Sequence, residues 1–424
     1  MVGTGVSAQI AGWFLHNLGA HLGSASDALP EPNHWQGDDD GGLPPGAATY
    51  ATSLALTAAG LLSVIGKEGV TVSTSEAVHH LLLPTTFTTP RDATHNSPLP
   101  WGNGALSCDL RSPGDRESFD RLLATIDNPA GLPAGIIAAR AQEWRLPVVD
   151  YVTRAQAQDD AAHPVVSGVG WGTGPDNRQP VTAAPPPAQQ PPALSIHDPI
   201  ASNLSPGGGT DRPLVGLTVV DMTSMWAGPL TTSLLSEAGA EVIKVEPSCR
   251  PDGMRGTPEM FAALNKNKER ADLDLRRADD RASFLALVGR ADLVIDSFSP
   301  RVMPNLGLTP ASLAEVGGPS LLTISMPAFP PGHRRSWIAY GTGVHAASGL
   351  GDTGDGRFSA PVVSYPDPIA GLTAFATALA LVVGRRLGWR PRHVEVSILA
   401  ATLPLLQFQA QRPSAVSATD VTAA

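Results

Sequence analysis

Cysteine is nearly absent from this chain. Cys108 and Cys249 are the only cysteines among 424 residues, and neither has a second cysteine or a histidine at metal-ligand spacing. Neither a disulfide framework nor a zinc site is therefore predicted, and a reducing cytoplasm is the expected compartment. We expect no metal and no permanently bound cofactor.

Basic residues are outnumbered by acidic ones. The chain has 29 Lys and Arg against 39 Asp and Glu, a formal net charge of -10, and no long basic block. Nucleic acid and anionic membranes are therefore not expected as partners. A small anionic ligand held by a few local cations is compatible with this charge.

No apolar run is long enough to predict a membrane span. The most apolar segment, residues 369–383, falls short of the ~20 residues that cross a bilayer, so it is interpreted as a buried helix. The N-terminal sequence MVGTGVSAQIAGWFLHNLG lacks a basic region followed by a clean apolar segment, so no signal peptide is predicted.

The composition changes sharply in the middle of the chain. Residues 168–212 include PVTAAPPPAQQPPALSIHDP and SPGGGT, which predict a linker rich in proline and glycine. This linker divides the chain into an N-terminal part, residues 1–167, and a C-terminal part, residues 213–410. A disordered tail is predicted for residues 411–424.

Strands alternate with helices after the linker. The sequence LTVVDMTSMWAGPLTTSLLSEAGAEVIKVE predicts a strand at 217–220, a helix with Pro229 in its first turn and Gly239 at its end, and a strand at 242–245. Further strands are predicted in ADLVIDSF and SLLTISM, each after a helix. The alternation predicts an α/β fold with a doubly wound, mostly parallel sheet.

Two internal similarities concern the N-terminal part. The sequence ATYATSLALTAAGLLSV, which starts at Ala48, aligns with the end of the C-terminal part, and Gly42 then lies opposite Asp367. A repeat and a chance match of Ala- and Leu-rich helices both remain open. The sequence DLRSPGDRESF from Asp109 also matches DLRRADDRASF from Asp274, at a different offset, so the two similarities do not form one tandem duplication.

A series of motifs follows in order between Pro213 and about Leu405: PLVGLTVVDMTSMWAGP, LLSEAGAEVIKVE, ALNKNKERADLDL, ADLVIDSFSPRVMPNLGL, HAASGL, PDPIAG and RHVEVSILAA. With this series the C-terminal part resembles the class III CoA-transferases, the family of formyl-CoA transferase and the 2-methylacyl-CoA racemases. The resemblance implies a Rossmann-like α/β domain with a smaller α+β domain, assembled as a dimer.

The N-terminal part contains PLPWGNGALSCDLRSPGDRESFDRLLATI and IAARAQEWRLPVVDY, which resemble the small domain of that family. Small-domain material is expected after VEVSILAA, but here it precedes the α/β part. Residues 1–167 are therefore interpreted as a degenerate CoA-transferase-like segment that includes small-domain material. A degenerate fusion and a permuted order both remain open.

Asp367 stands where the family has its nucleophile, an aspartate in a D-x-x-A-G context before a helix. A carboxylate suits CoA transfer because CoA thiolate, and then an acceptor acid, can capture an acyl-aspartyl anhydride. Pro368 is expected at the first helical position, which places Asp367 at the cap, where free N–H groups and the helix dipole favour the ionised form. The alternative is a helix cap without chemistry.

The resemblance also implies which residues contact CoA. Ala227 lies beside the nucleotide, and the adenosine and phosphate ends are lined by Leu273, Arg276, Ser297 and Phe298. Arg276 suits a phosphate by its chemistry, with a solvated residue before a helix as the alternative. Phe298 is equally compatible with a plain core position.

Several positions depart from the family pattern. Trp226 stands where a smaller polar residue is frequent, and Pro247 and Asn305 stand where many members have arginine, which weakens the prediction of CoA affinity. The racemase branch uses a His-Asp pair whose places fall on Tyr340 and Gly341. Transfer is therefore favoured over racemisation.

Two further motifs could be either ligand sites or simple surface turns and loops. The sequence GLGDTGDG at 349–356 contains G-x-G-x-x-G but does not open a helix after a strand, so a turn bordering the acyl site is expected rather than a dinucleotide site. His333, Arg334 and Arg335 can meet a CoA phosphate or form a solvated loop.

The predicted function is that of a cytoplasmic CoA-transferase, which moves CoA between an acyl-CoA and a carboxylic acid through an anhydride and thioester on Asp367. CoA and acyl-CoA are substrates, and a homodimer is expected. Racemase or epimerase activity on acyl-CoA is one alternative. A non-catalytic CoA-binding subunit is the other.

Overall fold

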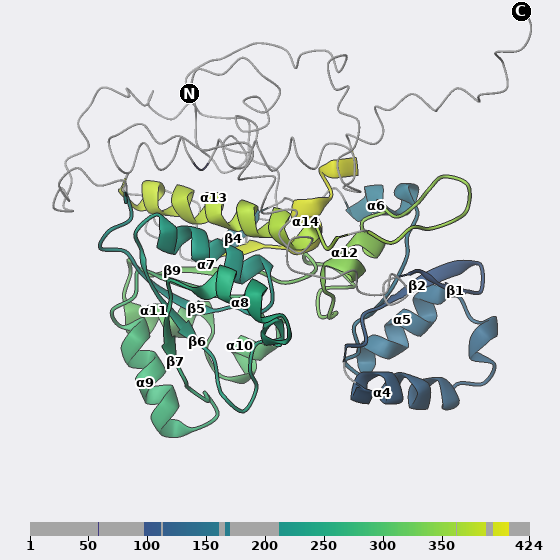
Figure 1. The fold of residues 1–424 in the computed structure, drawn as a ribbon, viewed down its shortest axis with the longest axis horizontal. Coiled ribbons are helices and arrows are strands. Elements are labelled where there is room, and N and C mark those ends of the chain that lie inside the picture. The colour runs from purple at the N-terminus through teal and green to yellow at the C-terminus, as the bar shows by residue number, and fades with distance from the viewer. Residues whose placement is uncertain are drawn as a thin grey trace, which may run out of the picture.

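The computed structural model of the protein describes an α/β part and a smaller α+β part (Figure 1). The described residues are 58, 97–111, 113–160, 166–169, 212–361, 363–386 and 393–406. Most of the predicted linker, the predicted tail and the Ala48 repeat copy apart from Ala58 lie outside these residues.

The α/β part is built on a seven-stranded sheet with the order β4-β10-β9-β8-β5-β6-β7. The strands are β4 (Val166–Val169), β5 (Thr218–Met222), β6 (Glu241–Val245), β7 (Glu269–Ala271), β8 (Leu293–Asp296), β9 (Leu322–Ser325) and β10 (His393–Val396). From β5 to β10 all neighbours are parallel, and β4 is antiparallel to β10. The predicted α/β class with a mostly parallel sheet is confirmed.

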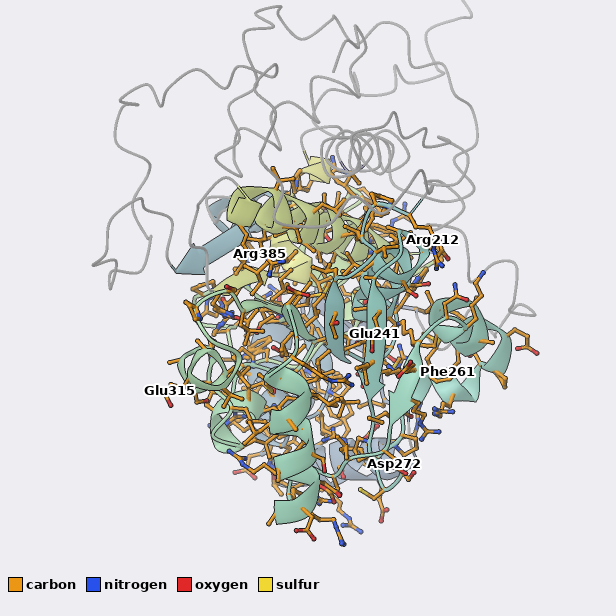
Figure 2. The ribbon with its side chains drawn as sticks, turned by 90° about the vertical axis from the view of Figure 1, so that its left-hand side faces the viewer. Arg212, Glu241, Phe261, Asp272, Glu315 and Arg385 are labelled. Carbon is orange, nitrogen blue, oxygen red and sulfur yellow. The ribbon has the colours of Figure 1, made fainter. Side chains whose placement is uncertain are left out.

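The chain winds the sheet in two directions from its middle. It runs outward from β5 through β6 to β7, then returns to the other side of β5 for β8, β9 and β10. This is a doubly wound order, which leaves a switch point between β5 and β8 at the carboxyl ends of the strands. Figure 2 shows the two ends of these parallel strands, with Glu241 at the amino end of β6 and Asp272 just after the carboxyl end of β7.

Helices cover both faces of this sheet (Figure 1). One face carries α7 (Ala227–Glu237), α8 (Pro258–Asn265) and α13 (Pro366–Arg386), and the other carries α9 (Ala278–Val288), α10 (Val302–Asn305) and α11 (Pro310–Gly317). Neighbouring residues of a strand point to opposite faces of the sheet. Val219 therefore packs in the apolar cluster with α7, α8 and α13, and Val220 packs in the cluster with α9, α10 and α11.

Helix α13 packs closely on α7. By length and composition it could cross a membrane, but 89% of its apolar window is buried inside the protein, in agreement with the predicted buried helix. A Cβ atom on Gly371 would lie 2.7 Å from the carbonyl oxygen of Ala227. The Thr231 hydroxyl donates to the Gly371 carbonyl at 3.0 Å, so the N-terminal halves of the two helices cross in contact.

The smaller part has a three-stranded antiparallel sheet, β1-β2-β3. Its elements are β1 (Leu99–Trp101), β2 (Gly104–Cys108), α4 (Pro113–Ala124), the 3-10 turn η2 (Pro129–Gly131), α5 (Ala134–Glu143), β3 (Val148–Asp150) and α6 (Arg154–Asp160). Leu106, Ile137 and Val148 are fully buried between the sheet and its helices. A smaller α+β unit is therefore present.

The smaller part packs against the segment that leads into α12 (Gly341–Ala347), close to α14 (Ile398–Thr402). The Gln142 amide donates to the Ile338 carbonyl at 2.8 Å and accepts from the Ile338 N–H at 2.6 Å. Arg334 forms an ion pair with Asp150 at 3.0 Å. These contacts hold α5 and β3 of the smaller part against the segment that leads into α12.

The predicted linker begins too early in the sequence. Gly168 and Val169 belong to β4, where they pair with Val394 and His393 of β10. The edge of β10 exposes backbone donors and acceptors, and a strand pairing with it satisfies them. Composition alone did not show this pairing because it depends on a strand far along the chain.

Candidate active site

Asp367 lies in the first turn of α13. The helix begins at Pro366, because the Ile369 N–H donates to the Tyr365 carbonyl at 3.2 Å and proline suits a first position that needs no donor. The predicted start at Pro368 is therefore wrong, and Asp367 is inside the helix rather than at its cap. A second proline at the helix start misled the sequence prediction.

Two groups donate hydrogen bonds to the Asp367 carboxylate. The Ser364 hydroxyl donates to Oδ2 at 2.8 Å, and the backbone N–H of Gly341 donates to the carboxylate as well. A Cβ atom on Gly341 would lie 2.3 Å from Oδ2 and 2.2 Å from the Ser364 hydroxyl. Only glycine lets the start of α12 approach the carboxylate this closely.

Burial controls the ionisation of Asp367. Loss of solvent raises the pKa of its carboxyl to about 6, although the Ser364 hydroxyl, the Arg111 charge and the Gly341 N–H each act to lower it. The sequence predicted that the helix start would favour the ionised form. Desolvation outweighs that effect, and the carboxyl is still mostly ionised at neutral pH.

Two charged side chains of the smaller part reach this site. Arg111 donates to Asp109 from Nε at 2.9 Å and from Nη2 at 3.0 Å. The guanidinium carbon of Arg111 lies 4.2 Å from the ring centre of Tyr340. The Thr342 hydroxyl donates to Asp109 at 2.9 Å.

The start of α12 thus joins the two parts through consecutive residues. Tyr340 stacks on Arg111, and the Gly341 N–H donates to Asp367. The Thr342 hydroxyl donates to Asp109, the carboxylate that is paired with Arg111. The site is built from one chain, with residues on both sides of the predicted linker.

Neither Asp109 nor Arg111 was selected from the sequence, although one signal pointed to them. The sequence D-L-R recurs at Asp274–Arg276, where the arginine donates to its aspartate from Nε at 2.8 Å and from Nη2 at 2.7 Å. Both D-L-R sequences form the same two-bond pair and precede a helix, α4 or α9. The similarity is therefore a local structural motif.

The residues predicted to contact CoA lie in loops or helix starts at one edge of the sheet. Ala227 begins the helix after β5, Leu273 and Arg276 follow β7, and Ser297 and Phe298 follow β8. In doubly wound sheets ligands bind at this carboxyl edge, near the switch point. The Ser224 N–H donates to the Ser297 hydroxyl at 3.0 Å and ties the two loops at the switch point together.

The environments of these residues differ. The Arg276 side chain is 72% exposed and paired with Asp274. Leu273 and Phe298 are half-buried against the apolar cluster under α9, and Ala227 is buried against α13. Since Ala227 contacts Gly371, the carboxyl edge is about one helical turn, or ~6 Å along α13, from Asp367.

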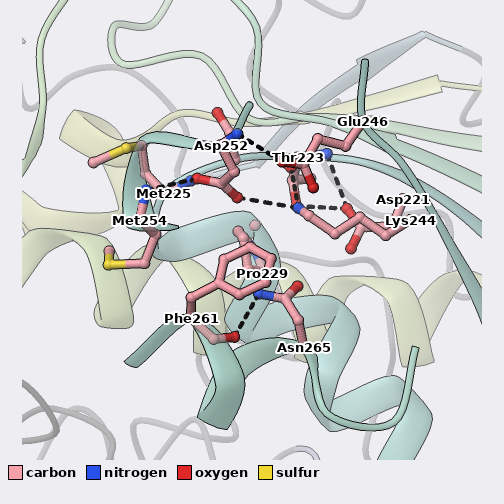
Figure 3. A network of polar contacts seen from close by, with 12 residues as sticks. Asp221, Thr223, Met225, Pro229, Lys244, Glu246, Asp252, Met254, Phe261 and Asn265 are labelled. Carbon is pink, nitrogen blue, oxygen red and sulfur yellow. Dashed lines mark hydrogen bonds and ion pairs between the residues drawn. The ribbon is translucent and has the colours of Figure 1, made fainter. Parts of the chain in front are cut away.

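A buried ionic network shapes the loop between β5 and α7 (Figure 3). Lys268 pairs with Asp221 at 3.0 Å, and Lys244 pairs with Asp252 at 3.1 Å. The Met225 N–H donates to Asp252 at 2.8 Å, and Met225 has a positive φ of 69°. Burial lowers the pKa of Lys268, while the two lysines overcome burial and lower the pKa of Asp221.

Comparison with known proteins bears on the α/β part. Residues 214–422 match CoA-transferase family III. The match covers just under half of the chain, and this matching segment is called the family III part below. The match begins just after the predicted linker, so the family III part contains both Asp367 and the predicted CoA residues.

Among the curated relatives, acetyl-CoA:oxalate CoA-transferase of Acetobacter aceti is 32% identical over 46% of this chain and 53% of its own length. The succinyl-CoA–L-malate CoA-transferase alpha subunit of Chloroflexus aurantiacus is 31% identical over 52% of this chain and 56% of its own length. The chain thus spans about half the length of these relatives. A crystal structure of a hypothetical protein from Mycobacterium tuberculosis aligns with a TM-score of 0.43 at 28% identity, over 47% of this chain and 58% of that one.

The other motifs of the family III part have structural partners. Residues 349–356 form a turn after α12, with Gly349, Gly354 and Gly356 at positive φ, and do not open a helix after a strand. Arg334 is paired with Asp150 and Arg335 with Glu395, so both guanidinium groups already have carboxylate partners. Among the described residues, no group of three or more His, Cys, Asp or Glu is arranged to hold a metal.

Proposed function

We propose that this protein is a CoA-transferase that moves CoA between an acyl-CoA and a carboxylic acid, with Asp367 as its covalent nucleophile. The observation that carries the proposal is the placement of Asp367. It is a buried carboxyl with a pKa of about 6 that accepts from Gly341 and Ser364 and lies one helical turn from the predicted CoA edge. Perturbed carboxyls in such surroundings are candidates for catalysis.

The first half-reaction forms an anhydride. An Asp367 oxygen attacks the thioester carbonyl, the C–S bond breaks, and CoA leaves as a thiolate while the acyl group forms a mixed anhydride with the side chain. The thiolate then attacks the aspartyl carbonyl. Donor carboxylate leaves, and an aspartyl-CoA thioester remains.

The second half-reaction reverses these steps with a new acid. The acceptor carboxylate attacks the aspartyl thioester, CoA thiolate leaves, and a second anhydride forms. The thiolate attacks the acyl carbonyl of that anhydride, which yields the new acyl-CoA and the free Asp367 carboxylate. No proton is transferred in either half, so the side chain only has to be ionised and held in place.

The contacts of Asp367 support both requirements. Gly341 and Ser364 hold the carboxylate in one orientation, and burial removes the water that would otherwise hydrolyse the anhydride. A carboxyl with a pKa near 6 is also a stronger nucleophile than an ordinary solvated carboxylate. The geometry therefore favours covalent chemistry over a purely structural helix start.

The substrates and assembly are part of the proposal. The relatives are named for acetyl-CoA with oxalate and for succinyl-CoA with malate, which suggests small acids as the first panel. A homodimer in a reducing cytoplasm remains our prediction, and the alpha-subunit name of one relative makes a second kind of subunit the alternative. Light scattering of the purified chain distinguishes a homodimer from a monomer that awaits a partner.

The decisive experiment is intact-protein mass spectrometry after incubation with acetyl-CoA or succinyl-CoA and hydroxylamine. We expect a hydroxamate at Asp367 in the wild type and none in Asp367→Asn. Titration with CoA provides the control, since the asparagine variant should still bind it. A folded wild type that binds CoA without ever being modified would instead support the non-catalytic subunit.

Racemisation is the weaker candidate. It needs an acid and a base on either side of the α-carbon. The resemblance places that pair at Tyr340 and Gly341. Burial raises the pKa of Tyr340, which makes it a poor base at neutral pH, and Gly341 has no side chain. Absence of deuterium exchange at the α-carbon of 2-methylacyl-CoA in D2O would exclude this activity.

A further inference from the structure

Arg111 is the cation nearest to the candidate nucleophile that belongs to the smaller part. Its Nε and Nη2 groups are both occupied by Asp109, and its flat face stacks on Tyr340. Among the described residues, Nη1 has no hydrogen-bond partner. The side chain is 44% exposed, so part of it is open to a ligand.

These contacts hold the guanidinium close enough to Asp367 for its charge to lower the pKa of that carboxyl. Tyr340 stacks on Arg111, and the next residue, Gly341, donates to the Asp367 carboxylate. Thr342 donates to Asp109, which holds Arg111 from the other side. The arginine is thus fixed on two sides, beside the reacting carboxylate and not within its hydrogen-bonding shell.

The proposed chemistry leaves one charge without a partner. In each half-reaction a free carboxylate of the substrate lies next to Asp367, either as the leaving donor acid or as the attacking acceptor acid. The Ser364 hydroxyl and the Gly341 N–H already donate to Asp367 itself. A carboxylate brought to this buried site needs a cation, and a guanidinium forms the strongest and most directional hydrogen bonds to it.

We propose that Arg111 binds the carboxylate of the acceptor and donor acids through Nη1, so that the smaller part selects the acid while the family III part binds CoA. This inference rests on the proposed CoA transfer and deepens it. The ligand class is a small carboxylic acid. An acid with a second carboxylate can bind Nη1 with one group while the other attacks the aspartyl thioester.

The D-L-R motif offers a matched pair of variants for the test. Arg111→Gln and Arg276→Gln each remove one two-bond arginine-aspartate pair, at Asp109 and Asp274 respectively. Arg140→Gln is the neutral control, because Arg140 also belongs to the smaller part but pairs with Glu143 on the exposed surface of its own helix. Kinetics with acetyl-CoA and oxalate, and with succinyl-CoA and malate, give a separate KM for each substrate.

We expect Arg111→Gln to raise the KM for the acid about 10- to 100-fold and to change the Kd for CoA by less than threefold, as the loss of a charge-assisted hydrogen bond predicts. Arg276→Gln should have the opposite pattern, with CoA affinity reduced and the acid KM unchanged. Arg111→Lys separates binding from electrostatics. It keeps the charge near Asp367 but loses the planar fork, so the acid KM should rise while the pH profile stays in place.

The kinetic results distinguish failure of the Arg111 proposal from failure of the CoA-transfer proposal. If the wild type transfers CoA and Arg111→Gln retains the wild-type KM for every acid, the role of Arg111 is overturned and CoA transfer stands. If the KM values for acid and CoA rise together and the melting temperature falls, Arg111 is structural and the inference is also overturned. A wild type that neither transfers CoA nor forms a hydroxamate refutes both proposals.

Discussion

Gly341 and Asp367 are in direct contact although they lie on different helices. A Cβ atom on Gly341 would be 2.3 Å from Oδ2 of Asp367, and the Gly341 N–H donates to that carboxylate. Any side chain at residue 341 would therefore move the carboxylate or the start of α12. The position of the candidate nucleophile depends on the absence of a single methyl group.

Gly341→Ala tests this contact. We expect the rate of hydroxamate formation at Asp367 to fall at least ~100-fold, because misplacement of a reacting group by about 1 Å has effects of that size. CoA binding, measured by titration, should change less than threefold. Gly256→Ala is the control, since no atom lies within 4 Å of a Cβ at Gly256. Equal rates in both variants would show that the contact is not needed.

The activity should depend on pH through Asp367. Its pKa of about 6 predicts that kcat/KM for acyl-CoA falls about tenfold per pH unit below pH 6 and is constant above it, because only the ionised carboxylate attacks. Arg111→Gln removes a charge that lowers this pKa, so the midpoint should move to higher pH. Stopped-flow measurement of acylation between pH 4.5 and 8 provides the profile. A profile that is flat across this range would contradict the assignment.

Burial of Asp367 should cost stability at neutral pH. The pKa is about 6 in the folded state against 3.8 without burial, so the folded state holds the proton more tightly and wild-type stability falls as the pH rises from about 4 to 6. Asp367→Asn does not titrate. It should be more stable than wild type by about 1 to 3 kcal/mol at pH 7.5, and the advantage should disappear below about pH 4.

Urea denaturation at the two pH values measures this difference. Ser364→Ala should instead be less stable than wild type at pH 7.5, since it removes a donor that stabilises the ionised carboxylate. A wild type more stable than the asparagine variant at pH 7.5 would mean that the carboxylate is compensated by its neighbours.

The buried ion pair between Asp221 and Lys268 should be essential for folding. Both side chains are almost fully buried, so Asp221→Ala leaves the Lys268 ammonium without its carboxylate and should destabilise the protein by about 3 to 5 kcal/mol. Asp355→Ala removes a carboxylate that is 47% exposed and should cost less than about 1 kcal/mol. Equal midpoints of urea unfolding for the two variants would contradict this expectation.

Local patterns were enough to predict much of the α/β part. Gly239 has a φ of 109° and follows α7, as expected of a glycine that ends a helix, and β5, β6, β8 and β9 lie within two residues of the predicted strands. Prolines were less informative. Two of them flank Asp367, and only the backbone bond from Ile369 to Tyr365 shows that the first begins the helix.

The sequence by itself determined the α/β class, the order of elements and the candidate nucleophile, because these depend on periodicity and on motifs of adjacent residues. Only the tertiary structure decided what surrounds that nucleophile. Arg111 lies far from Asp367 along the chain, and its approach depends on how the smaller part packs against α12. The raised pKa of Asp367 could not be predicted from the sequence either, since desolvation depends on all the residues that cover a side chain.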